Sequence, residues 1–337
     1  MNTGLLQKLI DSDGISGKEM EVRNVIEKEI KKYVTDIEVD KLGNLIAHKK
    51  GRGSSVMLAA HMDEVGLVVS EIGEKENDGR ISLHTIGGIE PLSLIGQKVS
   101  IENKVMGVIT TQEMSHGIYV EDIPTLENLF IDTGLTKKEL LKKGVNIGSY
   151  VSFAQCDYCT LGSSNIVLGK AVDNRVGCYM LLELAKLLKN SKEDIYYVFT
   201  VQEEIGLYGA KISAYQISPD WAIVIDVTDA NKKTVKLGNG PYITIKDADM
   251  LGNRCINNWL KDIAKKNRIN LQYSVSDVGT TDAQSIAFSK EGIPTSVVGV
   301  AVRNLHTSFG IVDMNDIQDA IKLIEILLKK PPKKCIV

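Results

Sequence analysis

The run from Tyr196 to Val201 is rich in aromatic and β-branched residues without polar alternation, and it leads directly to two adjacent carboxylates, Glu203 and Glu204. This pattern predicts a central strand of a sheet that is covered by helices on both faces. Ligands of open α/β sheets bind just beyond the carboxyl ends of such strands. We therefore expect this strand to carry its chemistry at its C-terminal end.

Three further apolar runs lead to polar side chains: residues 56–60 to His61 and Asp63, residues 221–225 to Asp226, and residues 295–300 to His306. Asp173 begins a helical pattern, so we expect its carboxylate at a helix N-terminus that faces the same crevice. Two histidines and several carboxylates on one rim are the ligand set of a hydrolytic pair of metal ions.

A simpler interpretation exists for part of this set. His61 and Asp63 alone fit a core histidine beside a surface aspartate equally well. Together with the other candidates that interpretation is disfavoured, because burying so many carboxylates side by side costs several kcal/mol each unless cations compensate them. The combination therefore favours a metal site.

The hydrophobic rhythm changes between about Gly66 and Leu161, where short apolar segments are separated by Gly, Asn and Asp. One helical pattern, at 137–143, interrupts them. This predicts a small β-rich module inserted into an α/β domain. We expect residues 1–65 and 162–337 to form the α/β domain, a three-layer α/β/α sandwich, and residues 66–161 to form a barrel-like module.

Two amphipathic helices are predicted at the start of the chain. Ser16 and Glu19 have the spacing of a capping box, which predicts that the second helix begins there. Residues 37–40 and 45–48 follow as a hairpin or as adjacent edge strands. Later, helices are expected near 252–267, 282–290 and 313–329.

Composition excludes several classes of protein. The chain has 337 residues, 43% hydrophobic and 25% charged, with a net charge of −3, which is typical of a globular protein of about two domains. The charges give no reason to expect nucleic acid or a membrane surface as a partner. No apolar run approaches the ~20 residues that span a bilayer, and the N-terminus lacks a secretory pattern. We expect a cytoplasmic protein.

Five cysteines are scattered along the chain, and the odd number predicts reduced thiols in a reducing compartment. Cys156 and Cys159 have zinc-knuckle spacing but lack a second pair, which favours an incidental pair over a metal site. Cys335 lies one residue too close to the end for a prenylation motif, so we expect an ordinary frayed tail.

Several blocks of the sequence resemble the M42 family of metallo-aminopeptidases. The resembling blocks are Ala60–Gly66, Gly169–Gly177, Thr200–Gly206, Ile225–Thr228, Leu237–Pro241 and Thr281–Ala283. Each block is weak alone, but their order and their spread over nearly the whole chain make the resemblance specific.

The resemblance implies roles for individual residues. One divalent ion would be held by His61 and Asp226, the other by Glu204 and His306, with Asp173 bridging both; Glu203 would be the general base, and Asp63 would orient His61. Two ions ~3.5–4 Å apart would share a water and polarise the scissile carbonyl. Imidazole and carboxylate ligands suit Zn²⁺, Co²⁺ or Mn²⁺ without choosing among them, although zinc and cobalt lead for this family.

The resemblance also implies a function and an assembly. The enzyme would remove N-terminal residues from short peptides. The inserted module would make dimers, which would build a dodecameric shell with interior active sites. A small β-rich module has little core and exposed strand edges, so pairing with a second copy would also stabilise it.

Two other functions compete with this one. A glycoside hydrolase would use a pair of carboxyl groups such as Glu203 and Glu204, but it would leave the histidines unexplained. An assembly protein with a vestigial site would not need every expected ligand, and every one is present.

Three positions depart from the family pattern. Thr280 replaces a glycine, Asn304 replaces a tyrosine, and no acidic residue follows His306. These changes leave the preferred N-terminal residue open. Arg303 fits equally well a structural ion pair and a contact with an acidic substrate.

Overall fold

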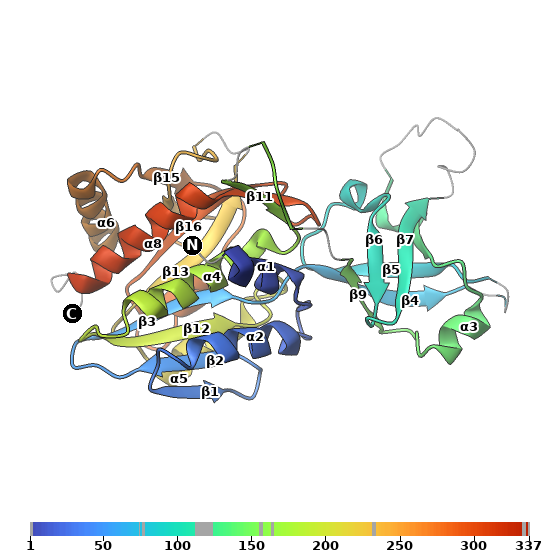
Figure 1. Ribbon diagram of the computed structural model, residues 1–337, viewed down its shortest axis with the longest axis horizontal. Helices are drawn as coiled ribbons and strands as arrows, with labels where there is room; N and C mark the ends of the chain where they lie inside the picture. Colours follow the sequence, from blue (N-terminus) through green and yellow to red (C-terminus); the bar gives the residue numbers. More distant parts are fainter. Residues whose placement is uncertain are drawn as a thin grey trace.

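The computed structural model describes residues 3–73, 75, 78–111, 124–154, 158–162, 165–230, 234–331 and 335. Figure 1 shows two lobes, a large α/β lobe and a smaller β-barrel that projects from one end of it. This arrangement confirms the predicted fold class, a layered α/β domain with an inserted barrel-like module.

An eleven-stranded mixed sheet forms the middle layer of the large lobe, in the order β1-β2-β12-β3-β13-β16-β17-β11-β10, with β14 beside β16 and β15 beside β14. Its strands are β1 Asp36–Val39, β2 Leu45–Lys49, β3 Ser55–His61, β10 Cys159–Thr160, β11 Ile166–Gly169, β12 Asp194–Thr200, β13 Trp221–Asp229, β14 Tyr242–Lys246, β15 Gln272–Val275, β16 Thr295–Arg303 and β17 Gly310–Asp313. The central strands β12, β3, β13 and β16 are parallel, so their carboxyl ends meet at one edge.

Helices cover both faces of this sheet (Figure 1). One layer contains α1 Thr3–Asp11, α2 Met20–Ile30, α4 Val172–Leu187, α6 Arg254–Asn267 and α8 Met314–Lys329, and the other contains α5 Tyr208–Ile217 and α7 Asp282–Ala287. Strand β3 illustrates the division: Leu58 packs into the first layer, whereas Met57 and Ala59 pack into the second. Both faces are buried, which explains the continuous apolar runs in the sequence.

The small lobe is a closed barrel in the order β4-β5-β8-β7-β6-β9. Its elements are β4 Gly66–Ile72, β5 Ile81–Ile86, η1 Pro91–Leu94, β6 Lys98–Ile101, β7 Val105–Thr111, η3 Leu126–Asn128, β8 Leu129–Asp132, α3 Lys137–Lys142 and β9 Tyr150–Phe153. The sequence pattern missed β8. The barrel has its own apolar core, but β10 already pairs with the large sheet, and the domain limits at 65 and 161 stay a prediction.

The predicted capping box is wrong. Helix α2 begins at Met20 after Glu19, which makes no side-chain cap bond. The Ser16 hydroxyl instead donates to Asp63 Oδ2 at 2.6 Å, and Glu19 Oε1 accepts from the backbone N–H of Gly17 at 2.7 Å. Both side chains are buried beside the end of β3, where a carboxylate from a distant segment competes successfully with the local cap.

The prediction that all cysteines are reduced is also wrong, because Cys255 and Cys335 form a disulfide. Packing of α6 against α8 places their Cα atoms 5.5 Å apart across 80 residues of sequence. The bond ties down Cys335, so the expected frayed tail is wrong at that residue. Cys159 and Cys178 are free. Cys156 lies outside the described residues, so its pairing with Cys159 is untested.

Candidate metal centre

Two of the candidate side chains come from the middle of the parallel sheet. In the strand register Thr200 lies opposite His61, and Val224 lies opposite Ala59, which brings Asp226 to the level of His61. His61 Nε2 is 3.7 Å from Asp226 Oδ1, and the two residues are only 2% and 4% exposed. The sheet itself therefore positions this pair.

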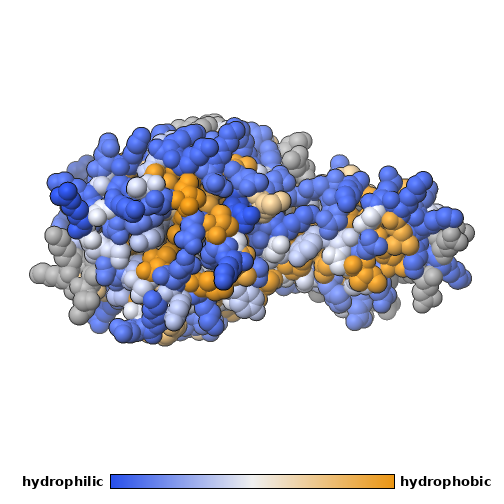
Figure 2. All heavy atoms as spheres, turned by 90° about the horizontal axis from the view of Figure 1, so that it is seen from below, coloured by the Kyte–Doolittle hydropathy of each residue, from blue (hydrophilic) through white to orange (hydrophobic). Residues whose placement is uncertain are grey.

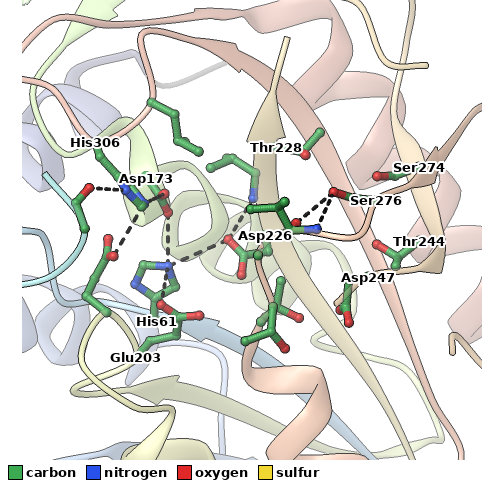
Figure 3. A pocket seen from close by; sticks show the side chains of 18 of the residues that line it. His61, Asp173, Glu203, Asp226, Thr228, Thr244, Asp247, Ser274, Ser276 and His306 are labelled. Atoms are coloured by element: carbon green, nitrogen blue, oxygen red, sulfur yellow. Dashed lines mark hydrogen bonds and ion pairs between the residues drawn. The ribbon is translucent and has the colours of Figure 1, made fainter. Parts of the chain in front are cut away.

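Asp173 lies between two imidazoles, near the start of α4. Its Oδ1 is 3.0 Å from Nε2 of His61, and its Oδ2 is 3.3 Å from Nε2 of His306 (Figure 3). The two oxygens of one carboxylate thus face two different histidines. This is the arrangement of a carboxylate shared between two sites.

Glu203 and Glu204 lie in the turn that follows β12. The carboxylate of Asp63 accepts hydrogen bonds from both of their backbone N–H groups, at 3.1 and 3.2 Å. His61 Nδ1 is bonded to the Asp63 carbonyl at 3.1 Å and lies 3.5 Å from its carboxylate. Asp63 therefore anchors the glutamate turn, a contact that the sequence did not reveal.

His306 follows β16 on a loop, and its φ of +57° lies in the left-handed region. Its Nδ1 is 2.7 Å from the carbonyl oxygen of Gly88, and its Nε2 is 3.5 Å from Glu204 Oε2. A carbonyl oxygen only accepts, so Nδ1 carries a proton. Nε2 faces the carboxylates, where a bound cation would take its lone pair in place of a second proton.

Three groups of side chains have ligand atoms within 4.8 Å of one another: His61 with Asp173 and Asp226, Asp173 with Glu204 and His306, and His61 with Glu203 and Glu204. We call His61 and Asp226 the sheet half of the site, and Glu204 and His306 the loop half. Asp173 belongs to both halves. These groups contain six of the seven candidate site residues. Asp63, the seventh, contacts His61 and the glutamate turn, so all seven converge on one place.

The electrostatics of the site favour added positive charge. Burial raises the pKa of Glu203 and of Asp226, and burial together with the charge of Asp173 raises the pKa of Glu204 to about 8. Burial lowers the pKa of His306, but its bond to Asp173 and the neighbouring carboxylates outweigh this and raise it to about 9. Crowded carboxylates of this kind are stabilised by bound cations, whose charge reverses these shifts.

One ligand atom has no partner in the described part of the chain. Glu204 Oε1 is buried without a hydrogen bond, which is costly for a carboxylate oxygen. A divalent cation beside it would remove that cost, so the donor set fits metal ions.

A buried ion network holds the segments of the site together. Glu64 accepts from Lys170 at 2.9 Å and from Arg175 at 3.0 Å, and all three side chains are at most 2% exposed. The network ties the end of β3 to the segment that carries Asp173. The sequence predicted none of these pairs, because residues of this type are normally solvated.

Asp282, like Glu64, is a buried acid to which the sequence analysis gave no role. Its Oδ2 accepts from the Thr200 hydroxyl at 2.5 Å, while Oδ1 has no partner among the described residues. Burial raises its pKa to about 7. Only its place in the Thr281–Ala283 block could have indicated it.

A cavity of about 390 Å³ opens beside the cluster. Figure 3 shows its far side, which carries Thr228, Thr244, Asp247, Ser274 and Ser276. Hydroxyl groups therefore dominate this wall. The cavity is large enough for an amino-acid side chain next to the candidate metal centre.

The positions that depart from the family pattern have local explanations. Gly279 has a φ of +79°, but Thr280 does not lie in the left-handed region, so a side chain is tolerated there. Thr280 lines the cavity. Asn304 donates to the Phe309 carbonyl at 3.3 Å and so braces the loop that carries His306. Arg303 is exposed, has no ion pair among the described residues, and does not line the cavity.

Comparisons with known proteins cover nearly the whole chain. A model of the M42 glutamyl aminopeptidase family matches residues 43–323. A putative aminopeptidase of Acetivibrio thermocellus is 39% identical over 328 residues, 95% of this chain and 96% of the relative. An aminopeptidase from the archaeon Desulfurococcus kamchatkensis superposes with a TM-score of 0.92 at 34% identity, covering 98% of this chain and 96% of that one.

A second solved structure is the TET1 peptidase of Pyrococcus horikoshii, described as assembling into a tetrahedron or a large octahedral shell. It has a TM-score of 0.86 at 31% identity and covers 97% of this chain and 99% of its own. No described helix is both long and apolar enough to cross a membrane. The resemblance carried by the sequence blocks is confirmed: the chain belongs to the M42 glutamyl aminopeptidase family and is a metal-dependent aminopeptidase, a hydrolase of peptide bonds.

Proposed function

We propose that this enzyme uses two divalent metal ions per subunit to remove N-terminal residues from short peptides. The sheet half, His61 and Asp226, would hold one ion, and the loop half, Glu204 and His306, the other. Asp173 would bridge them. Zn²⁺ and Co²⁺ suit these ligands best, and Mn²⁺ also fits them.

The observation that carries the proposal is the position of Asp173. Its two oxygens lie 3.0 and 3.3 Å from imidazole nitrogens of different halves. A carboxylate that served one ion, or a simple ion pair, would not need to face two histidines. A bridging ligand does.

Bound ions would supply positive charge that activates a water molecule and polarises the scissile carbonyl. Glu203 is the candidate general base, because its Oε2 lies 3.9 Å from His61 Nε2 and is not needed by either half. It would accept the proton of the attacking water and pass it to the leaving amine.

Exposed apolar side chains support an oligomer. On strand β7 of the barrel Met106 and Val108 are 57% and 41% exposed, and on the large lobe Tyr215 and Phe288 are 66% and 71% exposed. Figure 2 shows apolar patches on both lobes. Such patches mark contact surfaces. Dimers formed through the barrel would build a dodecameric shell in the cytoplasm that admits only short peptides. A similar solved structure, PhTET1-12s, is described as a dodecamer, which supports an assembly of this kind.

The glycoside hydrolase alternative is not favoured. It needs two carboxyl groups about 5–9.5 Å apart across a sugar, and it leaves the histidines without a role. Hydrolysis of Leu- and Glu-p-nitroanilides should be compared with hydrolysis of carboxymethylcellulose, each with and without a chelator. We expect chelator-sensitive release of p-nitroaniline; cleavage of the polysaccharide that survives chelation would overturn the proposal.

A further inference from the structure

The inserted barrel reaches the candidate metal centre through one turn. Gly87 and Gly88 connect β5 to η1, and the Gly88 carbonyl is the hydrogen-bond acceptor for His306 Nδ1, at 2.7 Å. A side chain at Gly87 would place its Cβ 2.8 Å from Val65 Cγ1 and 3.3 Å from Glu204 Cβ. The turn therefore lies against both residues of the loop half.

The sheet half is held differently. His61 Nδ1 is bonded to the Asp63 carbonyl, and Asp226 Oδ1 accepts from the Val227 N–H at 2.8 Å. Both partners belong to the large lobe, and both side chains are almost fully buried. The barrel contributes no hydrogen bond to this half among the described residues.

His306 needs an external support more than His61 does. Its side chain is 32% exposed, and its backbone has a φ of +57°, a conformation that costs a non-glycine residue free energy. Packing alone does not restrain a ring with so much exposed surface. The bond from Nδ1 to Gly88 sets both its tautomer and the direction of Nε2, as partners of metal-binding histidines generally do.

A second contact holds the same loop to the barrel. The Ser308 hydroxyl donates to Gln97 Oε1, which lies just after η1, at 2.5 Å. Ser308 is 7% exposed, so this bond is shielded from water. The His306 loop is thus fastened to the barrel at two points, two residues apart.

We propose that the Gly87–Gly88 turn of the barrel is a positioning element for His306, so that the loop half of the metal centre depends on how the barrel is seated and the sheet half does not. This inference rests on the proposed two-metal function. The barrel then has a role in the active site of its own subunit, beyond any contact with a second copy.

Gly87→Ala tests the proposal, with Gly96→Ala as the matched control. The two glycines lie in the barrel with φ of +85° and +81°, so alanine strains both backbones equally, but a Cβ at Gly96 meets nothing within 4 Å. Metal-free proteins are titrated with Co²⁺ and followed by visible absorption, and melting curves check folding. His306→Ala identifies which absorption increment belongs to the loop half.

We expect wild type and Gly96→Ala to bind two Co²⁺ ions. In Gly87→Ala, the absorption increment that His306→Ala lacks should appear only at about 10–100-fold higher Co²⁺ concentration. The other absorption increment should appear at the same Co²⁺ concentration as in the wild type. Equal titrations of the two glycine variants, or equal weakening of both increments in Gly87→Ala, would overturn the inference. A wild type that binds fewer than two ions would overturn the two-metal function as well.

Ser308→Ala keeps the proposal testable if Gly87→Ala does not fold. It removes the bond to Gln97 without adding an atom. The loop half should again need more Co²⁺ than in the wild type. The increase should be smaller than in Gly87→Ala, because the Gly88 carbonyl still contacts His306. An unchanged loop-half increment in this variant, with Gly87→Ala unfolded, would contradict the proposal.

Discussion

The two halves of the candidate metal centre each combine a histidine with a carboxylate but are built in different ways. His61 and Asp226 lie in adjacent parallel strands whose register sets their spacing, and they are 2% and 4% exposed. Glu204 and His306 lie on turns after their strands, and His306 is 32% exposed. One half depends on the sheet, whereas the other depends on loops and on a carbonyl from the barrel.

On the proposed two-metal function, the inserted module would influence catalysis without supplying a side chain to it. Backbone pairing of β3 with β13 sets the spacing of the sheet half. The loop half requires contacts between segments that are more than 200 residues apart. We therefore expect the sheet half to be the tighter and less adaptable of the two metal sites.

The largest effect should follow loss of the residue that joins the halves. In Asp173→Ala both metal sites should fail together, because one carboxylate serves both and its absence leaves two cations to repel each other. Activity should fall more than about 10⁴-fold, beyond the loss of any single proton-transfer step. Elemental analysis measures bound metal. Asp277→Ala, at a side chain that is 92% exposed, is the control. Two tightly bound ions in Asp173→Ala would show that the bridge lies elsewhere.

A smaller effect is expected from Glu203→Gln, which leaves the ligands of both halves intact. Turnover should fall about 10²–10⁴-fold with KM little changed, because proton transfer is lost without loss of a ligand. Steady-state kinetics and metal analysis on the same sample distinguish a loss of proton transfer from a loss of bound metal. Near-wild-type turnover in a variant that retains both metals would remove Glu203 from the role of general base.

The smallest effect is expected on the stability of the fold. It comes from Glu19, which directly precedes α2 and lies close enough to Asp63 to feel its charge. Burial raises the pKa of Glu19 from 4.5 to about 7, and the charge of Asp63 adds to the rise. The folded protein therefore prefers the protonated acid: this contribution to stability is complete below pH 4.5 and is lost as the pH rises through about 7.

Glu19→Gln mimics the protonated form and keeps an acceptor for the Gly17 N–H. At pH 8 it should exceed the wild type in free energy of unfolding by about 2–3 kcal/mol, and at pH 4.5 the difference should shrink to less than about 0.5 kcal/mol. Denaturant unfolding at both pH values measures this. A difference that does not change with pH would mean that the carboxyl of Glu19 does not titrate as its burial implies.

Much of this molecule could be predicted from local patterns. The continuous apolar run before Glu203 identified a central strand covered on both faces, because a strand buried on one face only shows polar alternation. The apolar runs before His61 and Asp226 were predicted as buried strands in the same way. These side chains were therefore expected at the carboxyl edge of the sheet. Short segments broken by glycine and asparagine indicated the barrel, and the M42 resemblance was carried by contiguous blocks of side chains.

Other features were decided only by the tertiary structure. Ser16 donates to Asp63 instead of capping a helix, and Cys255 pairs with Cys335 across 80 residues, because each bond depends on where a distant segment lies. The support of His306 is the clearest case. Its partner is a backbone carbonyl, which every residue has, so nothing in the identity of Gly88 marks it as an acceptor. Sequence patterns report which apolar side chains are buried, whereas the folded chain decides which polar groups meet.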